Sequence, residues 1–340
     1  MSEPTLDILG IGNAIVDVLA RAEDHFLADR AMTKGAMRLI GAEQAEALYA
    51  SMGPGVESSG GSAANTCAVA AALGARVGFL GKVADDALGQ VFAHDIRAAG
   101  VEFRTHPLPA ATAPTARCLI LVTPDGQRTM NTFLGAAVHF SAADVEETTV
   151  AAAAVLYLEG YLFDPPAAQA AFRQASAAAH RAGRRVALSL SDPFCVERHR
   201  AAFRRLVREE VDILFANQAE LLSLYQVSDF AEAARLARQE VALAALTRSE
   251  HGSVLATPEE EQVVQAVPTR VVDTTGAGDA YAAGVLAALT QGLPLAECGR
   301  WGAVAASEVI SHFGARPQAD LKALVAAGRP GNRTVSAVLG

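Results

Sequence analysis

The sequence predicts an α/β fold: a doubly wound, mainly parallel central sheet with helices on both faces, plus a small β-sheet lid. Two observations predict the core. Hydrophobic residues make up 51% of the 340-residue chain, which is ample material for a large buried interior. Short apolar runs also alternate with longer amphipathic segments, and this alternation is typical of a parallel sheet. The lid is predicted from two regions that break the alternation.

The elements of the core follow from these runs in chain order. Short apolar runs predict buried strands at residues 6–11, 77–83, 155–158, 186–190, 213–216 and 243–247. Helical periodicity predicts helices at residues 63–73, 88–99, 166–182, 200–208, 218–225 and 230–239. Residues 13–40 and 103–133 instead contain strand-like pieces separated by turn signals. We expect one domain over residues 1–340, with a lid formed by about 13–40 and 103–133.

Composition and charge exclude several classes of protein. The net charge of −9, without a run rich in lysine and arginine, argues against a nucleic-acid surface. The four cysteines are scattered without a paired spacing, and no zinc motif is present, which suits reduced thiols and a cytoplasmic protein. The first residues lack the basic and apolar regions of a signal peptide, and the most apolar window, 63–80, is interrupted by polar residues. We therefore expect no membrane span.

Two nucleotide-binding patterns do not fit. Gly10 and Gly12 follow a strand, but the third glycine of a dinucleotide-binding fingerprint is missing. Gly81 and Lys82 have no glycine five positions earlier and are followed by Val83, so the phosphate-loop pattern fails too. A bound nucleotide would need another device to hold its phosphates.

The run DTTGAGD at residues 273–279 is the most informative motif. It follows an apolar run and opens an alanine-rich helical pattern, so Gly276, Ala277 and Gly278 lie at a helix N-terminus. Free N–H groups and the helix dipole make such a place an anion site. Asp279 adds a carboxylate beside it, which suits a base that takes a proton from a hydroxyl while the amides hold a phosphoryl group. An ordinary turn with Asp279 as a helix cap is the alternative.

A second glycine pair, Gly60 and Gly61, opens the helix predicted at 63–73. Its backbone amides and the amide of Asn65 suit hydroxyls as well as anions, because an amide side chain both donates and accepts hydrogen bonds. Asp17 follows the first strand and could accept hydrogen bonds from a diol. A flexible loop leading into the helix, and a solvated Asp17, are the alternatives.

Asn217 and Glu220 begin a helix directly after a predicted strand and lie on one helical face. The carboxyl ends of strands are where open α/β sheets place their sites, and this pair suits a water-mediated Mg²⁺ ion. An ordinary N-cap with a glutamate in the first turn is equally compatible with the pattern.

Taken together, the two glycine motifs resemble those of the ribokinase-like (PfkB) carbohydrate and nucleoside kinases, over nearly the whole chain from Leu6 to about Arg316. Within that family the chain is most similar to adenosine kinases, through GNAIVDV at 12–18, NTFLGAA at 131–137, LSLSDPF at 188–194 and VDILFANQAE at 211–220. The resemblance implies ATP-dependent phosphorylation of the 5′-hydroxyl of adenosine, with Mg²⁺ and in some relatives K⁺. A kinase for inosine, guanosine or ribose is the alternative, and a non-catalytic nucleoside-binding protein is a third.

The resemblance also implies a role for each matching residue. Asp279 would be the general base, and Gly276, Ala277 and Gly278 would hold the γ-phosphoryl group. The remaining roles would be as follows: nucleoside contacts at Asn13, Asp17, Gly60, Gly61, Asn65, Phe133, Leu134 and Glu159; ATP and Mg²⁺ contacts at Asn217, Glu220, Thr247, Arg248 and Gly252; a monovalent-cation site at Asp273, Thr275, Val309, His312 and Gly314. The family includes both monomers and homodimers.

Four positions depart from the relatives. Ser62 stands where sugar-directed ribokinases tend to have lysine, which favours a nucleoside over free ribose. Ser249 stands where many relatives have glycine. Glu159 and Asp164 differ from the more apolar pattern of animal adenosine kinases. A carboxylate at such a strand end could bind a base amino group or a sugar hydroxyl, or be solvated.

Overall fold

The computed structural model describes residues 3–328, and within them nine strands form one large sheet. Across the sheet the order is β14 (Glu261–Val264), β13 (Ser253–Ala256), β12 (Leu243–Thr247), β11 (Ile213–Asn217), β10 (Arg185–Ser189), β9 (Ala153–Glu159), β1 (Leu6–Ile11), β5 (Val77–Leu80) and β6 (Val101–Phe103). Pairing is parallel from β12 to β6 and antiparallel for β13 and β14 at one edge. The predicted mainly parallel sheet is confirmed.

All six predicted core strands are present, as β1, β5, β9, β10, β11 and β12. Three others were not predicted. The edge strand β6 has only three residues, and β14 is half exposed with the polar sequence EQVV, so neither has the apolar run that marks a buried strand. The buried strand β13 is the partner of β14 in the same hairpin. Phe103 ends β6 and thus belongs to the large sheet.

Helices cover both faces of the large sheet. On one face the hydrophobic core includes side chains of α3 (Ser62–Ala72), α4 (Ala87–Ala98), α10 (Ala277–Thr290), α11 (Leu295–Val309) and α12 (Leu321–Ala327). On the other it includes α5 (Glu147–Ala151), α6 (Pro166–Arg181), α7 (Pro193–Glu209), α8 (Gln218–Tyr225) and α9 (Phe230–Ala237). None of the helices within residues 3–328 is long and apolar enough to cross a lipid bilayer.

The start of α7 differs from the prediction of a helix at 200–208. The helix begins at Pro193, with Asp192 as its N-cap accepting a 2.7 Å hydrogen bond from the Cys195 N–H. A break in helical geometry at His199 separates this first part from the rest. Because the first part ends in the charged or polar residues Glu197, Arg198 and His199, it has no clear apolar face in the sequence.

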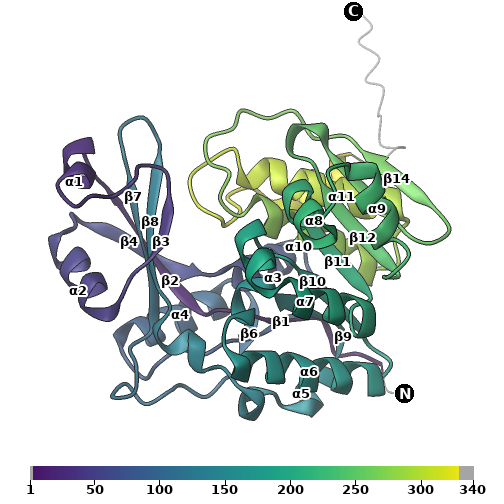
Figure 1. The fold of residues 1–340 in the computed structure, drawn as a ribbon, viewed down its shortest axis with the longest axis horizontal. Coiled ribbons are helices and arrows are strands. Elements are labelled where there is room, and N and C mark those ends of the chain that lie inside the picture. The colour runs from purple at the N-terminus through teal and green to yellow at the C-terminus, as the bar shows by residue number, and fades with distance from the viewer. Residues whose placement is uncertain (1–2, 329–340) are drawn as a thin grey trace, which may run out of the picture.

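A second, small sheet stands to one side of the large one (Figure 1). Its order is β3 (Met37–Leu39), β8 (Arg128–Phe133), β7 (Ala116–Val122), β2 (Ile15–Arg21) and β4 (Gly55–Gly60). The helices α1 (Asp24–Ala28) and α2 (Ala42–Ser51) lie on its far side from the large sheet (Figure 1). Both predicted regions contribute strands, whereas β4, with its sequence GVESSG, has only Val56 as a β-forming residue and was not predicted.

Short 3₁₀ helices complete the connections: η1 (Gly135–His139), η2 (Ala142–Asp144), η3 (Gly160–Phe163) and η4 (Ser249–His251). Of these, η3 directly follows β9 and η4 directly follows β12, at the carboxyl ends of parallel strands.

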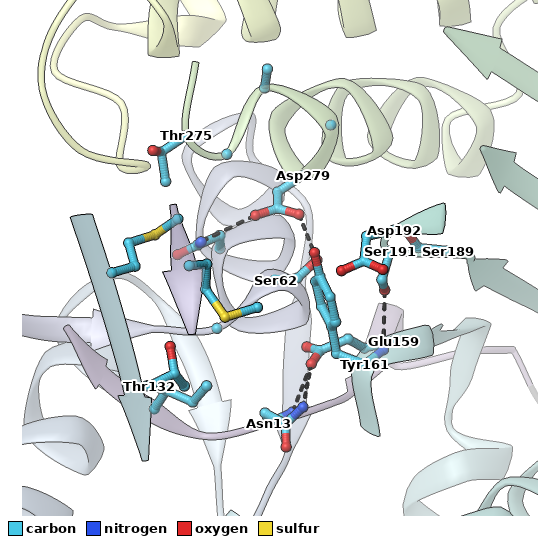
Figure 2. Close-up of a pocket in the computed structure, with 18 of the residues that line it drawn as sticks. Asn13, Ser62, Thr132, Glu159, Tyr161, Ser189, Ser191, Asp192, Thr275 and Asp279 are labelled. Atoms are coloured by element: carbon cyan, nitrogen blue, oxygen red, sulfur yellow. Dashed lines mark hydrogen bonds between the residues drawn. The ribbon is translucent and has the colours of Figure 1, made fainter. Parts of the chain in front are cut away.

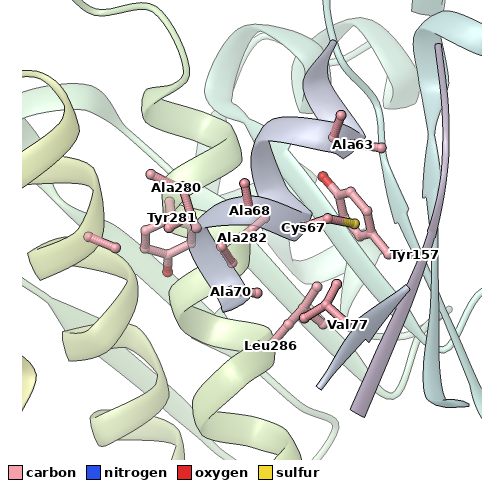
Figure 3. Packing of buried hydrophobic residues seen from close by; sticks show 14 of the residues in the cluster. Ala63, Cys67, Ala68, Ala70, Val77, Tyr157, Ala280, Tyr281, Ala282 and Leu286 are labelled. Atoms are coloured by element: carbon pink, nitrogen blue, oxygen red, sulfur yellow. The ribbon is translucent and has the colours of Figure 1, made fainter. Parts of the chain in front are cut away.

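The helices α3 and α10 pack against each other through small side chains, among them Ala68 and Ala282 (Figure 3). Residues 280–288 of α10 are all buried, so this helix is apolar around its whole circumference rather than along one stripe. Alanine allows two helix backbones to approach closely. As a result, the two glycine-rich helix starts predicted from the sequence lie at the same end of the molecule.

Candidate active site

A cleft of about 630 Å³ lies between the carboxyl ends of the parallel strands and the inner face of the small sheet. Most residues singled out in the sequence line it: Asn13, Asp17, Gly61, Asn65, Leu134, Glu159, Asn217, Glu220, Thr247, Thr275, Gly276, Ala277, Gly278 and Asp279. The cleft therefore joins, in one cavity, segments that are more than two hundred residues apart, such as Asn13 and Asp279.

At the start of α10 the backbone is open to this cleft. Gly276 is the N-cap with a φ of 76°, a left-handed conformation that favours glycine, and no side chain caps the helix. A Cβ atom built on Gly278 would meet nothing within 4 Å. The Ala277 N–H donates to the Thr274 carbonyl at 3.2 Å, whereas the N–H groups of Gly276 and Gly278 have no hydrogen-bond partner within residues 3–328. First-turn N–H groups of this kind are suited to an anion.

Asp279 lies in the first turn of the same helix and faces the cleft (Figure 2). Its Oδ1 accepts a 2.6 Å hydrogen bond from the Ser62 hydroxyl, and its Oδ2 accepts one of 3.1 Å from the Asn65 amide. None of the salt bridges within residues 3–328 involves it. Burial raises the pKa of Asp279, while the two hydrogen bonds and the charge of Arg316 oppose that rise.

The start of α3 is built differently. Glu159, at the end of β9 and 1% exposed, accepts hydrogen bonds from the Ala63 N–H (2.8 Å) and from the side-chain amide of Asn13 (2.7 Å; Figure 2). Burial raises the pKa of Glu159 to about 7 although these donors favour its charged form. Its carboxylate thus ties the loop after β1 to the first turn of α3, and it is not the solvated residue considered above.

Asp17 reaches the cleft from β2 of the small sheet. Burial raises its pKa to about 6, and the charges of Arg316 and Arg128 pull in the other direction. Gly60 lies directly beneath it, because a Cβ atom there would meet Asp17 Oδ2 at 2.3 Å. Gly60 does not line the cleft itself; it makes room for the Asp17 carboxylate.

The wall opposite the large sheet is mainly apolar. It is formed by the inner side of the small sheet and includes Ile15, Met37, Leu39, Ile120, Met130 and Leu134. Met37 and Leu39 are 47% and 57% exposed, which is unusual for large apolar side chains next to a site. Phe133, expected as part of this wall, does not line the cleft. Side chains alternate along a strand, and on β8 it is Met130 and Thr132 that face inward.

On the other side of the cleft, Asn217 and Glu220 form a reciprocal capping box at the start of α8. Asn217 Oδ1 accepts the Glu220 N–H at 2.9 Å, and the Glu220 carboxylate accepts the Asn217 N–H at 2.9 Å. Burial raises the pKa of Glu220 to about 7. Each of these oxygens keeps a second lone pair, so the donor set fits a cation held mainly by water and phosphate. No cluster of three acidic, His or Cys side chains suited to a metal occurs in the described part of the chain.

Of the other residues expected near ATP, only Thr247 lines the cleft. The Arg248 side chain bonds Gln218 at 3.3 Å and lies 4.6 Å from the centre of the Phe230 ring. Gly252 forms the turn between η4 and β13, away from the cavity. Ser249 has a φ of 51°, the left-handed conformation that glycine adopts without strain, so a glycine would fit this position with less strain than serine.

Asp273, one of the residues expected at a monovalent-cation site, has several protein partners. The Asp273 carboxylate already accepts the Thr275 N–H (3.0 Å) and the Gly314 N–H (2.9 Å), and it pairs with Arg128 at 2.8 Å. The Arg128 guanidinium therefore balances the charge of the Asp273 carboxylate. His312 bonds Glu308, and Val309 is buried in α11.

Several residues in or beside the cleft were not identified from the sequence as functional. Arg128 of β8 does not line the cleft, but it donates to the Thr275 hydroxyl at 3.0 Å and so links the small sheet to the segment before α10. Tyr161, Ser191 and Asp192 gather at the ends of β9 and β10. Ser191 has a φ of 71°, an uncommon conformation for a residue with a side chain. Ser191 and Asp192 belong to the LSLSDPF motif at 188–194, but no spacing in the sequence marks them, Tyr161 or Arg128 as site residues.

Comparison with known proteins gives a consistent picture. Residues 36–321 match the model of the pfkB family carbohydrate kinases. The structure of an adenosine kinase from Sinorhizobium meliloti is 51% identical with a TM-score of 0.88, covering 95% of this chain and 99% of that one. A probable sugar kinase from Rhizobium etli CFN 42 is 50% identical with a TM-score of 0.88, covering 95% of this chain and 98% of that one.

A more distant relative is an uncharacterized sugar kinase of Escherichia coli, 32% identical over 209 residues. The aligned segment spans 58% of this chain and 61% of that kinase, less than two thirds of its length. The family model covers most of the chain and includes the cleft residues from Met37 to Asp279. The chain belongs to the pfkB family of carbohydrate kinases.

Proposed function

We propose that this kinase transfers the γ-phosphoryl group of ATP to the 5′-hydroxyl of adenosine, giving AMP and ADP. The observation that carries the proposal is the placement of Asp279 at the uncapped start of α10, in a cleft whose opposite wall is apolar. A carboxylate next to free backbone amides suits a proton acceptor beside a phosphoryl group in transfer. The likeness to the S. meliloti adenosine kinase supports the choice of acceptor.

The apolar wall favours a nucleoside over a free sugar. Met37 and Leu39 of β3 would be covered by a flat, apolar nucleobase, whereas a free pentose is too small and too polar to cover them. Asp17, Asn65 and the Gly61 backbone line the same cleft, and in this proposal they bind the ribose hydroxyls. The order along the cleft is then base, ribose and reacting hydroxyl.

In this arrangement Asp279 accepts the proton of the attacking hydroxyl. Burial raises the pKa of its carboxyl group, which makes it a stronger base, and the hydrogen bonds from Ser62 and Asn65 hold it in position. The amides at Gly276–Gly278 stabilise the negative charge on the transferring group. Mg²⁺, when bound near Asn217 and Glu220, would neutralise charge on the triphosphate.

We further propose that the small sheet acts as a lid within a single domain. The ion pair between Arg128 and Asp273 supports this role, because it joins β8 to the segment that precedes α10. Closure excludes water and so limits the hydrolysis of ATP. Four buried, unpaired cysteines support a reducing compartment such as the cytoplasm.

A kinase for another nucleoside or for ribose is the second candidate, supported by the likeness to the R. etli probable sugar kinase. The two candidates are separated by measuring ADP release with ATP and Mg²⁺ over adenosine, inosine, guanosine, cytidine and ribose. We expect kcat/KM for adenosine to exceed that for ribose by about 100-fold or more, because ribose forfeits the contacts with the base. Phosphorus NMR of the product should place the phosphate on the 5′-oxygen.

Comparable kcat/KM values for ribose and adenosine would contradict the proposed acceptor. Absence of ADP release with every acceptor, together with tight nucleoside binding measured by calorimetry, would instead identify a binding protein. Both measurements use the full chain and need no variant.

A further inference from the structure

Arg316 lies in the loop after α11 and reaches across to two other segments. Its Nη1 donates to the Ala64 carbonyl at 2.8 Å, and its Nη2 donates to the Ser59 carbonyl at 2.7 Å and the Ser59 hydroxyl at 2.9 Å. Ser59 is near the end of β4 in the small sheet, and Ala64 is in the first turn of α3. One side chain therefore joins the small sheet, the second glycine-rich helix start and the C-terminal part of the core.

The charge of Arg316 has no direct ion-pair partner. All three acceptors are neutral, no salt bridge within residues 3–328 includes this guanidinium, and its Nε is buried without a hydrogen-bond partner. A partly desolvated cation attracts nearby carboxylates more strongly than an exposed one. The carboxylates that act on it are Asp95, Asp17 and Asp279.

Asp95 is the structural member of this group. Its Oδ2 accepts hydrogen bonds from the Ser59 N–H (2.7 Å) and from the Ser59 hydroxyl (2.5 Å). Ser59 is thus held between Asp95 of α4 and Arg316, which fixes the end of β4. The position of Arg316 is set by backbone carbonyl groups and by this serine. Its positive charge therefore remains available to the cleft carboxylates Asp17 and Asp279.

The surroundings of Asp279 are otherwise acidic or weakly acidic. The ionisable groups of the described chain that interact with it are Asp17 of β2, Tyr157 and Glu159 of β9, Tyr161 of η3, Glu220 of α8 and Arg316. Arg316 is the cation of this set. Without it, the ionised form of Asp279 would face only groups that are neutral or negative, which disfavours the negative charge that a general base requires.

We propose that Arg316 is a positioning residue that fixes β4 and the first turn of α3 beside α10 and supplies the positive charge that keeps Asp279 ionised. The proposal rests on the proposed role of Asp279 as the base. Arg316 does not line the cleft, so it acts through Asp279 and Asp17 rather than on a substrate. It extends the active site to a residue 37 positions beyond Asp279 in the chain.

Two substitutions separate the effect of the Arg316 charge from the effect of its hydrogen bonds to Ser59 and Ala64. Arg316→Gln removes the charge and keeps an amide that can donate to the Ser59 or Ala64 carbonyl, whereas Arg316→Lys keeps the charge and loses part of the hydrogen bonding. The acid limb of kcat/KM against pH reports the pKa of the base in the free enzyme. We expect this limb to move upward by at least about half a pH unit in Arg316→Gln and to stay near its wild-type position in Arg316→Lys.

Arg300→Gln is the matched control. Arg300 also holds a backbone carbonyl, that of Val325 at 2.7 Å, and also has a buried nitrogen without a partner, but it lies away from the cleft. We expect it to lower the thermal unfolding midpoint without moving the acid limb. Equal shifts in Arg316→Gln and Arg316→Lys, or no shift in either, would overturn the proposal.

A second readout does not depend on turnover. Carboxyl ¹³C NMR of aspartate-labelled protein, with the Asp279 signal assigned through Asp279→Asn, gives the pKa of Asp279 directly in the unliganded enzyme. The same upward shift is expected in Arg316→Gln, and an unchanged Asp279 titration would refute the inference. If no acceptor is phosphorylated by the wild-type chain, the proposed function fails while this titration still tests Arg316. Circular dichroism of each variant confirms that it is folded.

Discussion

Two glycine-rich helix starts face each other in the cleft, at α3 and at α10, and they look alike in sequence. At α3 the loop is closed by the protein: Gly61 has a φ of 99°, and the Ala63 N–H is bonded to Glu159. At α10 the loop is open: no side chain caps the helix, and the space beside Gly278 is empty. A buried carboxylate thus occupies at α3 the kind of position that a phosphate would take at α10.

The difference shows that a glycine pair before a helix does not by itself specify an anion site. Whether such a helix start can bind an anion depends on whether the protein already places one of its own carboxylates there. The two starts are then connected through Asp279, because Ser62 and Asn65 in the first turn of α3 donate hydrogen bonds to this residue of α10. We therefore expect the closed start at α3 to support Asp279, and the open start at α10 to be the place where phosphoryl transfer occurs.

The largest expected effect tests the open start. Asp279→Asn removes the base but leaves the amides in place, so kcat should fall by about 10³-fold while KM changes little. Steady-state ADP release with the preferred acceptor measures both constants. A variant with near-normal kcat would remove Asp279 from the role of base and with it the distinction between the two starts.

A pair of alanine substitutions sharpens the comparison directly. In Gly278→Ala the added methyl group meets no protein atom, so stability should be kept while activity falls by about 10- to 100-fold, since the methyl group intrudes where the phosphoryl group binds. In Gly61→Ala the Cβ atom would lie 2.2 Å from the Asn13 carbonyl oxygen, at an unfavourable φ. That variant should lose about 2 kcal/mol or more of stability.

Urea unfolding and ADP release of both variants provide the test. The opposite outcome, an unstable Gly278→Ala and an inactive but stable Gly61→Ala, would reverse the assignment of the open and the closed start.

A smaller effect is expected from the carboxylate that closes α3. Glu159→Gln replaces one acceptor oxygen with a donor facing the N–H groups of Asn13 and Ala63, which should cost about 1 to 3 kcal/mol. The folded-state pKa of Glu159 is raised from 4.5 to about 7. Its contribution to stability is therefore greatest below pH 4.5 and is lost as the pH rises toward 7.

Urea midpoints at pH 5 and pH 8 measure this dependence, which should be weaker in Glu159→Gln than in the wild type. An identical pH dependence in both proteins would mean that Glu159 is not the buried, proton-binding support that the structure indicates.

The smallest effect concerns the connection between the two starts. Ser62→Ala removes the 2.6 Å hydrogen bond to Asp279, which favours the ionised carboxylate. The acid limb of kcat/KM should therefore move upward by up to about one pH unit, with only a few-fold loss of activity at pH 8. A pH profile identical to that of the wild type would show that α3 supports α10 through packing alone.

Local sequence determined much of the fold. The apolar runs of β1 and β12 and the helical pattern of α8 were predicted to the residue, because burial imposes a clear period on such segments. Strand β4 and the first part of α7 were not predicted, since their pairing and capping depend on distant partners rather than on their own residues. The glycine motifs and Asp279 were also identified from sequence, because free amides at a helix start require these residue types.

Tertiary structure alone decided how the site is completed. No sequence spacing shows that Glu159 closes the start of α3, that Arg128 pairs with Asp273, or that Phe133 does not line the cleft. Each of these depends on which strand lies next to which, and on the face of the strand that a side chain occupies. Residue type sets which chemistry is available, whereas the pairing of distant segments sets which groups are already satisfied and which remain free for a substrate.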